Sequence, residues 1–193
     1  IDSLHAKVLS DHKKFSDALY FDFVDWAAKT WNLPLAIDND ARVALIGEWQ
    51  HGAGKGYTDL AMITLGTGIG TAVIMGGQLL RGKHFQAGNL CGHLTVQFNG
   101  TECYCNNLGC AEMETSTKYL NRLTHSMEGY SQSPLSKFET FDYQSLFECA
   151  DQNDPIAIQL LERSLRIWSS IAVNMIHAFD PECILVGGGI MAS

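Results

Sequence analysis

The sequence has few basic residues and no long apolar run. Its 13 Lys and Arg residues are outnumbered by 21 Asp and Glu residues, which gives a formal net charge of −8 over 193 residues. A nucleic-acid-binding surface normally shows a basic stripe, so we expect no nucleic acid partner for this chain. No run of 18 apolar residues is present, so we also expect no membrane-spanning helix and no membrane partner. With 46% hydrophobic residues, the chain can nevertheless bury one sizeable core.

Three of the six cysteines lie close to a histidine, in the order His93-x9-Cys103-x-Cys105-x4-Cys110. Three thiolates and one imidazole make a complete tetrahedral zinc set, with no position open for a catalytic water. The alternative is that these cysteines are small buried hydrophobes, but the segment around them is polar and rich in turn residues. We therefore predict a structural zinc in this loop, with Cys91 a packed thiol and not a fifth ligand. The closely spaced thiols beside a histidine also favour a reducing cytoplasm over secreted disulfides.

The apolar periodicity predicts an α/β fold with hairpins. Helices are expected over residues 21–31, 41–49, 113–126, 143–150 and 156–179, and strands over residues 35–37, 60–65, 71–75, 78–80 and 183–186. The helix at 156–179 is apolar on most sides and is predicted to be buried against a sheet. Residues 51–58 are glycine-rich, but they follow a helix and lack the Gly-Lys-Ser/Thr ending of a phosphate loop. We interpret them as a flexible connector.

Two polar or glycine-rich segments follow predicted strands, where the ligands of α/β proteins gather. The first is residues 38–40. Because a helix is predicted next, the pattern alone favours Asp40 as a plain N-cap over a carboxylate that contacts a ligand. The second is Gly-Thr-Gly-Ile-Gly at residues 66–70, between two strands. Its glycines would let backbone N–H groups approach an anion and adopt positive φ, although a tight hairpin alone would use the same residues.

The segment CYCNNLGCAE, which ends at Glu112, resembles the CxCGxxGCxE signature of the ROK family of repressors, open reading frames and sugar kinases. Asn106 stands where glycine is usual. IDNDA at residues 37–41, LGTGIG at 65–70 and GGG at 187–189 resemble further family segments in the same order and spacing. The resemblance implies a ribonuclease-H-like fold of the actin and hexokinase type. Residues 21–193 would be the larger C-terminal lobe, truncated at its end, and residues 1–20 a connector from a missing N-terminal lobe.

The resemblance also implies a function, namely an ATP-dependent kinase that transfers the γ-phosphate to a hydroxyl of a hexose or amino sugar, as in bacterial glucokinases. Asp40 matches the family's catalytic base, which reverses the preference for a plain N-cap. The implied sugar contacts are Asn39, Asp40, Asn89, His93 and Glu112. The implied ATP contacts, with magnesium on the phosphates, are Gly66, Thr67, Gly68, Gly70, Gly187, Gly188 and Gly189. A homodimer is expected, and the isolated fragment is expected to be inactive.

Two departures from the family pattern bear on the substrate. Typical sugar kinases of this family read E-x-G-H up to the zinc histidine, whereas this chain has Leu90 in place of the sugar-holding glutamate and Asn89 one residue earlier. Arg42 stands where a small polar residue is common, which we interpret as tuning. The rival hypothesis is a ROK transcriptional regulator that senses sugar without phosphorylating it. The retained Asp40 favours the kinase, and the missing glutamate favours the regulator. A free-standing zinc module would leave Asn39 and Asp40 unexplained.

Overall fold

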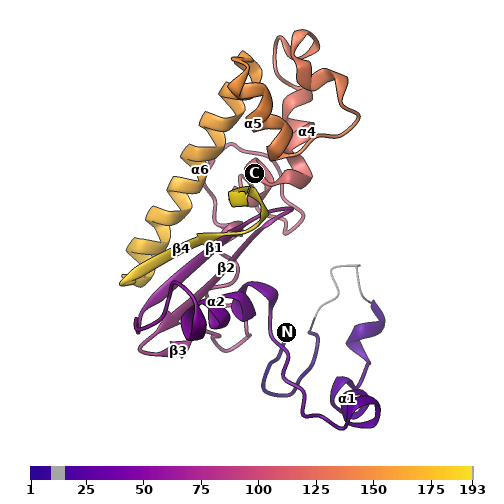
Figure 1. Ribbon diagram of the computed structural model, residues 1–193, viewed down its shortest axis with the longest axis vertical. Coiled ribbons are helices and arrows are strands. Elements are labelled where there is room, and N and C mark those ends of the chain that lie inside the picture. Colours follow the sequence, from indigo (N-terminus) through magenta and orange to yellow (C-terminus); the bar gives the residue numbers. More distant parts are fainter. Residues whose placement is uncertain (10–15, 193) are drawn as a thin grey trace.

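The computed structural model describes residues 1–9 and 16–192. Its α-helices are α1 (Phe23–Trp31), α2 (Asp40–His51), α3 (Ala111–Thr115), α4 (Thr117–His125), α5 (Tyr143–Asp151) and α6 (Pro155–Phe179). Its strands are β1 (Leu60–Leu65), β2 (Ile69–Met75), β3 (Gln78–Leu79) and β4 (Cys183–Gly187). Part of the predicted connector, residues 10–15, lies outside the described residues. Figure 1 shows α1 set apart from the sheet.

The four strands form one mixed sheet in the order β3-β2-β1-β4. β1 and β2 pair as an antiparallel hairpin that closes with Leu65 opposite Ile69. β4 runs parallel to β1, with Thr64 opposite Gly187. The hairpin turn at residues 66–68 and the residues after β4 therefore leave the sheet at the same end. The two glycine segments that the sequence analysis singled out meet there, at the carboxyl ends of parallel strands.

Strand β1 is buried on both faces, and each face has its own helix. Because side chains alternate along a strand, one set joins the core shared with α6, and the other packs against α2. The first set is Ala61, Ile63 and Leu65, and the second is Leu60 and Met62. Figure 1 shows α2 and α6 on opposite faces of the sheet. The predicted α/β architecture is confirmed by this layering.

Helix α6 buries one stripe of its surface. Leu160, Ile167 and Ile171 are at most 8% exposed, whereas Leu165 is 56% and Val173 is 46% exposed. The helix packs against the sheet as predicted, but the prediction of burial on most sides was wrong. No element among the described residues covers the outer face of the helix, so its apolar side chains there stay accessible.

Two predicted elements differ in the structure. Residues 35–37 run without helix or strand pairing among the described residues, since three apolar residues give no periodic signal and Pro34 lacks an N–H. The helix predicted at 113–126 is divided into α3 and α4, because Ser116 takes an extended backbone with φ −68° and ψ 150°. Thr117 then donates from both its N–H and its hydroxyl to the carbonyl of Gly66. The break in the helix therefore ties α4 to the glycine turn.

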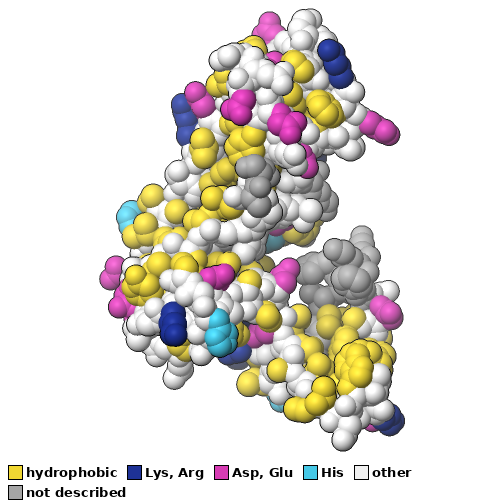
Figure 2. Space-filling view, in the orientation of Figure 1, with side chains coloured by type: hydrophobic (Ala, Val, Ile, Leu, Met, Phe, Trp, Pro, Cys, Tyr) yellow, Lys and Arg dark blue, Asp and Glu magenta, His cyan; other side chains and the backbone are white. Residues whose placement is uncertain are grey.

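Exposed hydrophobic side chains gather over α1, as the yellow area in Figure 2 shows. Trp26 and Trp31 are 40% and 55% exposed, and their rings pack edge to face with centroids 4.4 Å apart. Ala27 is the one buried residue of this helix. Among the helices of the described residues, none has both the length and the apolar content that crossing a bilayer requires.

Candidate functional site

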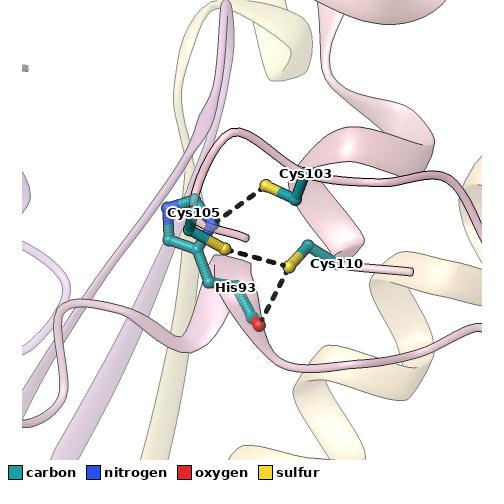
Figure 3. A group of neighbouring side chains, drawn as sticks. All are labelled: His93, Cys103, Cys105 and Cys110. Atoms are coloured by element: carbon teal, nitrogen blue, oxygen red, sulfur yellow. Dashed lines mark hydrogen bonds between the residues drawn. The ribbon is translucent and has the colours of Figure 1, made fainter. Parts of the chain in front are cut away.

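The predicted zinc ligands converge in the loop before α3 (Figure 3). The four ligand atoms of His93, Cys103, Cys105 and Cys110 all lie within 4.8 Å of one another. The Nδ1 atom of His93 is 3.6 Å from Sγ of Cys103, and Sγ of Cys105 is 3.6 Å from Sγ of Cys110. Metal–ligand bonds of about 2.0–2.3 Å would set the ligand atoms of a tetrahedral zinc roughly 3.5–3.8 Å apart. The side chains present therefore fit zinc in both chemistry and spacing.

Burial opposes ionisation of two of these thiols. Burial, together with the neighbouring thiols of Cys105 and Cys103, raises the pKa of Cys110 to about 12. Burial also raises the pKa of Cys103. Thiolates and not thiols bind metal, so a cation that binds this cluster would displace their protons and compensate the buried charge.

Two residues give the metal loop its turns. Asn106 has a φ of +66°, a left-handed conformation that glycine and asparagine adopt more readily than other residues. This conformation explains how asparagine can stand where the ROK pattern has glycine. Gly109, with φ +63°, has no room for a side chain, since a Cβ would lie 1.7 Å from the carbonyl oxygen of Gln97. Asn107 holds the turn from inside by donating to the carbonyl of His93 at 3.2 Å.

Tyr104 connects the metal loop to Glu112, and the sequence analysis missed it. The Nε2 atom of His93 is 3.3 Å from the Tyr104 hydroxyl, which donates to Oε1 of Glu112 at 2.6 Å. With Nδ1 bound to a metal, the ring proton would be on Nε2, which would then donate to Tyr104. Metal-binding histidines commonly have such a partner on their second nitrogen. Tyr104 could have been noticed in the sequence, because it lies between the predicted ligands Cys103 and Cys105 and must therefore be close to the metal position.

Glu112 also reaches the glycine turn. Its Oε2 atom accepts from the N–H of Ile69 at 2.9 Å, so one N–H of the turn is already used. A Cβ on Gly68 would lie 2.7 Å from the same oxygen. None of Gly66, Gly68 and Gly70 has a positive φ, so that part of the prediction was wrong. Gly68 is needed for the close approach of Glu112, and not for an unusual backbone conformation.

Most of the predicted sugar and ATP residues line one open cleft of about 390 Å³. From the predicted sets, the cleft is lined by Asn39, Asp40, Asn89, His93, Glu112, Gly66, Thr67, Gly68, Gly70, Gly188 and Gly189. Gly187 is not among the lining residues; it ends β4, opposite Thr64. A larger cavity of about 520 Å³ lies elsewhere, but its two charged side chains, Glu114 and Arg163, form an ion pair with each other. The smaller cleft is therefore the candidate site.

The start of α2 places two polar side chains at this cleft. Asn39 is the N-cap, because its Oδ1 accepts from the N–H groups of Ala41 at 3.1 Å and Arg42 at 3.4 Å. The interpretation of Asp40 as the N-cap was therefore wrong by one residue. The cap uses the oxygen of Asn39 and leaves its Nδ2 for a ligand. Asp40 is exposed in the first turn, where the helix dipole favours a negative charge.

Asn89 and Leu90, the departures from the family pattern, both line the cleft. Leu90 is 44% exposed. The Oδ1 atom of Asn89 is buried and has no hydrogen-bond partner among the described residues. A buried acceptor left unpaired costs about 1–3 kcal/mol. A turn of the Asn89 side chain that brings Oδ1 to a donor in the cleft would therefore be favoured.

The mixed sheet, with helices on both faces and the cleft at its end, belongs to the ribonuclease-H-like fold of actin and hexokinase-type ATPases. A sequence model described as the ROK family matches residues 1–193, and the chain belongs to that family. Glucokinase of Thermotoga maritima is 34% identical over 181 residues, with 91% of this chain and 57% of that protein covered. The xylose repressor of Bacillus spizizenii is 29% identical over 172 residues, with 89% and 42% covered.

A solved structure confirms the fold. The ROK family glucokinase from Streptomyces griseus, in complex with glucose and AMPPNP, has a TM-score of 0.73 and 30% sequence identity to this chain. The likeness covers 91% of this chain and 57% of that one. The chain thus spans about half the length of the relatives that it matches.

Proposed function

We propose that the full-length protein containing this chain is an ATP-dependent sugar kinase, which transfers the γ-phosphoryl group to a hydroxyl of a hexose or amino sugar. The observation that carries the proposal is the single cleft bounded by Asp40, by Glu112 with His93, and by the glycine turn at residues 66–70. This reaction needs a carboxylate to accept a proton, polar side chains to hold the sugar hydroxyls and a turn whose backbone can approach the phosphates. The similarity to glucokinases supports the same function.

In the proposed reaction, Asp40 accepts the proton of the attacking sugar hydroxyl. The Nδ2 atom of Asn39 and the carboxylate of Glu112 hold neighbouring hydroxyls, and the Nε2–H group of His93 is shared between Tyr104 and a further hydroxyl. Phosphoryl transfer needs mainly in-line positioning and charge stabilisation, so the value of these contacts lies in fixing one hydroxyl toward the phosphate. Glu112 suits this role because Tyr104 and Ile69 already fix both of its oxygens.

The phosphates would lie against the turn at residues 66–70 and against Gly188 and Gly189. The residues that line the cleft include two carboxylates, Asp40 and Glu112, and no Lys or Arg among those the structure describes. A triphosphate would be repelled by these charges unless a cation screened them. Magnesium, which bridges phosphate oxygens in kinases, is therefore part of the proposal.

Zinc has a structural role in this proposal. All four of its coordination positions would be filled by His93, Cys103, Cys105 and Cys110. The ion would therefore stabilise the folded loop and provide no Lewis acid chemistry. The folded loop in turn holds Tyr104 against Glu112. The metal thereby supports the sugar contact without touching the reacting atoms.

The test is a coupled assay of ADP release by the full-length protein with glucose, mannose and N-acetylated hexosamines. Asp40→Asn keeps the shape and hydrogen-bonding capacity of the side chain but cannot take a proton. We expect turnover to fall by roughly two to four orders of magnitude while sugar affinity is largely kept. Normal turnover in Asp40→Asn would reduce Asp40 to a residue of the first helical turn and refute its catalytic role.

A sugar-sensing transcriptional regulator is the second candidate function. The absence of the family glutamate at Leu90 and the similarity to a xylose repressor favour it. A full-length protein that binds sugar but releases no ADP would establish this alternative over the kinase. The proposal also includes a homodimer and a cytoplasmic location; analytical ultracentrifugation of the full-length protein tests the former, and cell fractionation the latter.

A further inference from the structure

Arg42 is completely buried on α2, directly after the cleft residues Asn39 and Asp40. Its guanidinium group reaches across to a loop 43 to 45 residues further along the chain. Nη1 donates to the carbonyl of Phe85 at 3.0 Å, and Nη2 donates to the carbonyl of Ala87 at 2.9 Å. A buried cation is thus used to hold the backbone of one loop.

Asp38 balances the charge of Arg42. Its Oδ1 atom lies 3.4 Å from Nη1 of Arg42, and its Oδ2 atom accepts from Nη2 of Arg81 at 2.9 Å. The Arg42 and Asp38 side chains are 0% and 7% exposed, so their pair is shielded from water, whereas Arg81 is 34% exposed. Arg81 differs from Arg42 in one respect that matters for a control. Among the described residues, its guanidinium bonds Asp38 and Ser3, and no carbonyl of the loop.

The loop held by Arg42 needs support. Phe85 has a φ of +56°, which is unfavourable for an aromatic residue and persists only where the surroundings fix it. Gly88 has a φ of +75°, and a Cβ there would lie 3.1 Å from Val73 of β2. The loop is therefore fixed by α2 on one side and packed against β2 on the other, immediately before Asn89.

Asn89 follows two residues after the carbonyl that Arg42 binds at Ala87. Asn89 lines the cleft, and its Oδ1 atom is buried without a partner among the described residues. The side chain of the neighbouring Leu90 has no group that can form a hydrogen bond. Asn89 is thus the polar group that this loop brings to the sugar part of the cleft, and its placement depends on the loop backbone.

We propose that Arg42 is a positioning residue that fixes Asn89 through the carbonyls of Phe85 and Ala87, and that Asn89 determines which sugar hydroxyls the cleft accepts. This inference rests on the proposed function to the extent that the cleft binds sugar. It requires no phosphoryl transfer. It also links the two departures from the family pattern, since Arg42 would fix Asn89, which stands next to Leu90.

The test is a double-mutant cycle on sugar affinity, measured by calorimetry with the full-length protein and glucose, mannose and N-acetylglucosamine as probes. We expect Arg42→Lys to raise the Kd of the preferred sugar about tenfold, because lysine cannot reach both carbonyls. Asn89→Ala should raise it by a similar factor, and the double variant should be no worse than Asn89→Ala alone. The Kd of an ATP analogue should stay unchanged in the two single variants and in the double variant. A general structural defect would change it as well.

Arg81→Lys is the matched control, since it makes the same chemical change at the other partner of Asp38. We expect its sugar Kd to stay within about twofold of the wild type. If Arg42→Lys does not retain a folded protein, Arg42→Gln replaces it in the cycle, because it removes the buried charge and keeps one donor. The positioning role would be overturned if the Kd increases of the two single variants multiplied in the double variant. It would also be overturned if Arg81→Lys raised the sugar Kd as much as Arg42→Lys does. Sugar binding without ADP release would overturn the proposed kinase and leave this inference standing, whereas absence of sugar binding would overturn both.

Discussion

Replacing Cys105 with alanine tests the metal loop with the least disturbance of packing. Cys103 and Cys110 are 2% and 0% exposed, whereas Cys105 is exposed, so its removal deletes a ligand and leaves no cavity. Structural zinc in small peptides binds with about 10–16 kcal/mol. An equal share for one of four ligands is about 3 kcal/mol, which corresponds to zinc affinity on the order of a hundredfold weaker.

The loss should extend from the metal to the cleft. Tyr104 lies next to Cys105 in the chain and donates to Glu112 at 2.6 Å. When the loop loses its metal, this hydrogen bond to a charged group, worth about 1.5–3 kcal/mol, loses its support. We therefore expect sugar affinity of the full-length protein to fall about tenfold or more, although Cys105 does not line the cleft.

The assay is elemental analysis of natively purified protein, followed by competition with a chromophoric chelator and calorimetry with sugar. Cys149→Ala is the control, because Cys149 is a buried thiol on α5 outside the metal cluster. It should keep its full zinc content and its sugar affinity. Wild-type protein without zinc, or Cys105→Ala with undiminished zinc affinity, would refute the assignment of this loop as a structural metal site.

Three further predictions concern the cleft. Tyr104→Phe should keep zinc but lower kcat/KM for sugar about tenfold, because Glu112 loses a charged hydrogen bond; unchanged kinetics would make Tyr104 a packing residue. Leu90→Glu should narrow the sugar range more than it changes the KM for ATP, because a carboxylate in the cleft wall demands a matching hydroxyl; an unchanged kcat/KM ranking of glucose, mannose, fructose and their N-acetylated relatives would contradict it. The isolated 193-residue chain should bind zinc but release no ADP with any sugar, and turnover by it would place the whole phosphate site in this lobe.

Local apolar runs were sufficient to predict the central strands. The run at residues 60–65 is strand β1 with the same bounds, and the run at 183–186 is β4 with one residue added. The first run holds five apolar residues and the second holds four, and turn residues bound each of them, which is the pattern of a buried strand. The three-residue run at 35–37 has the same composition without the length. The break at Ser116 was invisible for another reason, because it depends on a contact of Thr117 with the distant Gly66.

In the candidate site, too, the residues close together in the sequence could be predicted and those far apart could not. The metal set could be found from sequence because its four ligands lie in one short segment, where spacing alone restricts geometry. The cleft residues come from five separate segments, and only the family resemblance grouped them. The contact of Arg42 with Phe85 spans 43 residues, and no local pattern predicts which carbonyl a buried guanidinium will reach. The sequence marked Arg42 only as a departure that we interpreted as tuning, and the structure shows the loop contacts that its side chain makes.

The path from the metal loop to the glycine turn would explain why the proposed kinase carries the proposed zinc site, which has no catalytic position. His93, Tyr104 and Glu112 form a chain of hydrogen bonds that ends at the N–H of Ile69, inside the proposed phosphate turn. Glu112 thus lies between the proposed sugar contacts and the proposed phosphate contacts, held at both oxygens. Misplacement of a reacting group by about 1 Å can cost on the order of a hundredfold in rate. A tetrahedral ion with four short bonds is a stiffer anchor for such a chain than loop packing, since this loop has few apolar residues to bury.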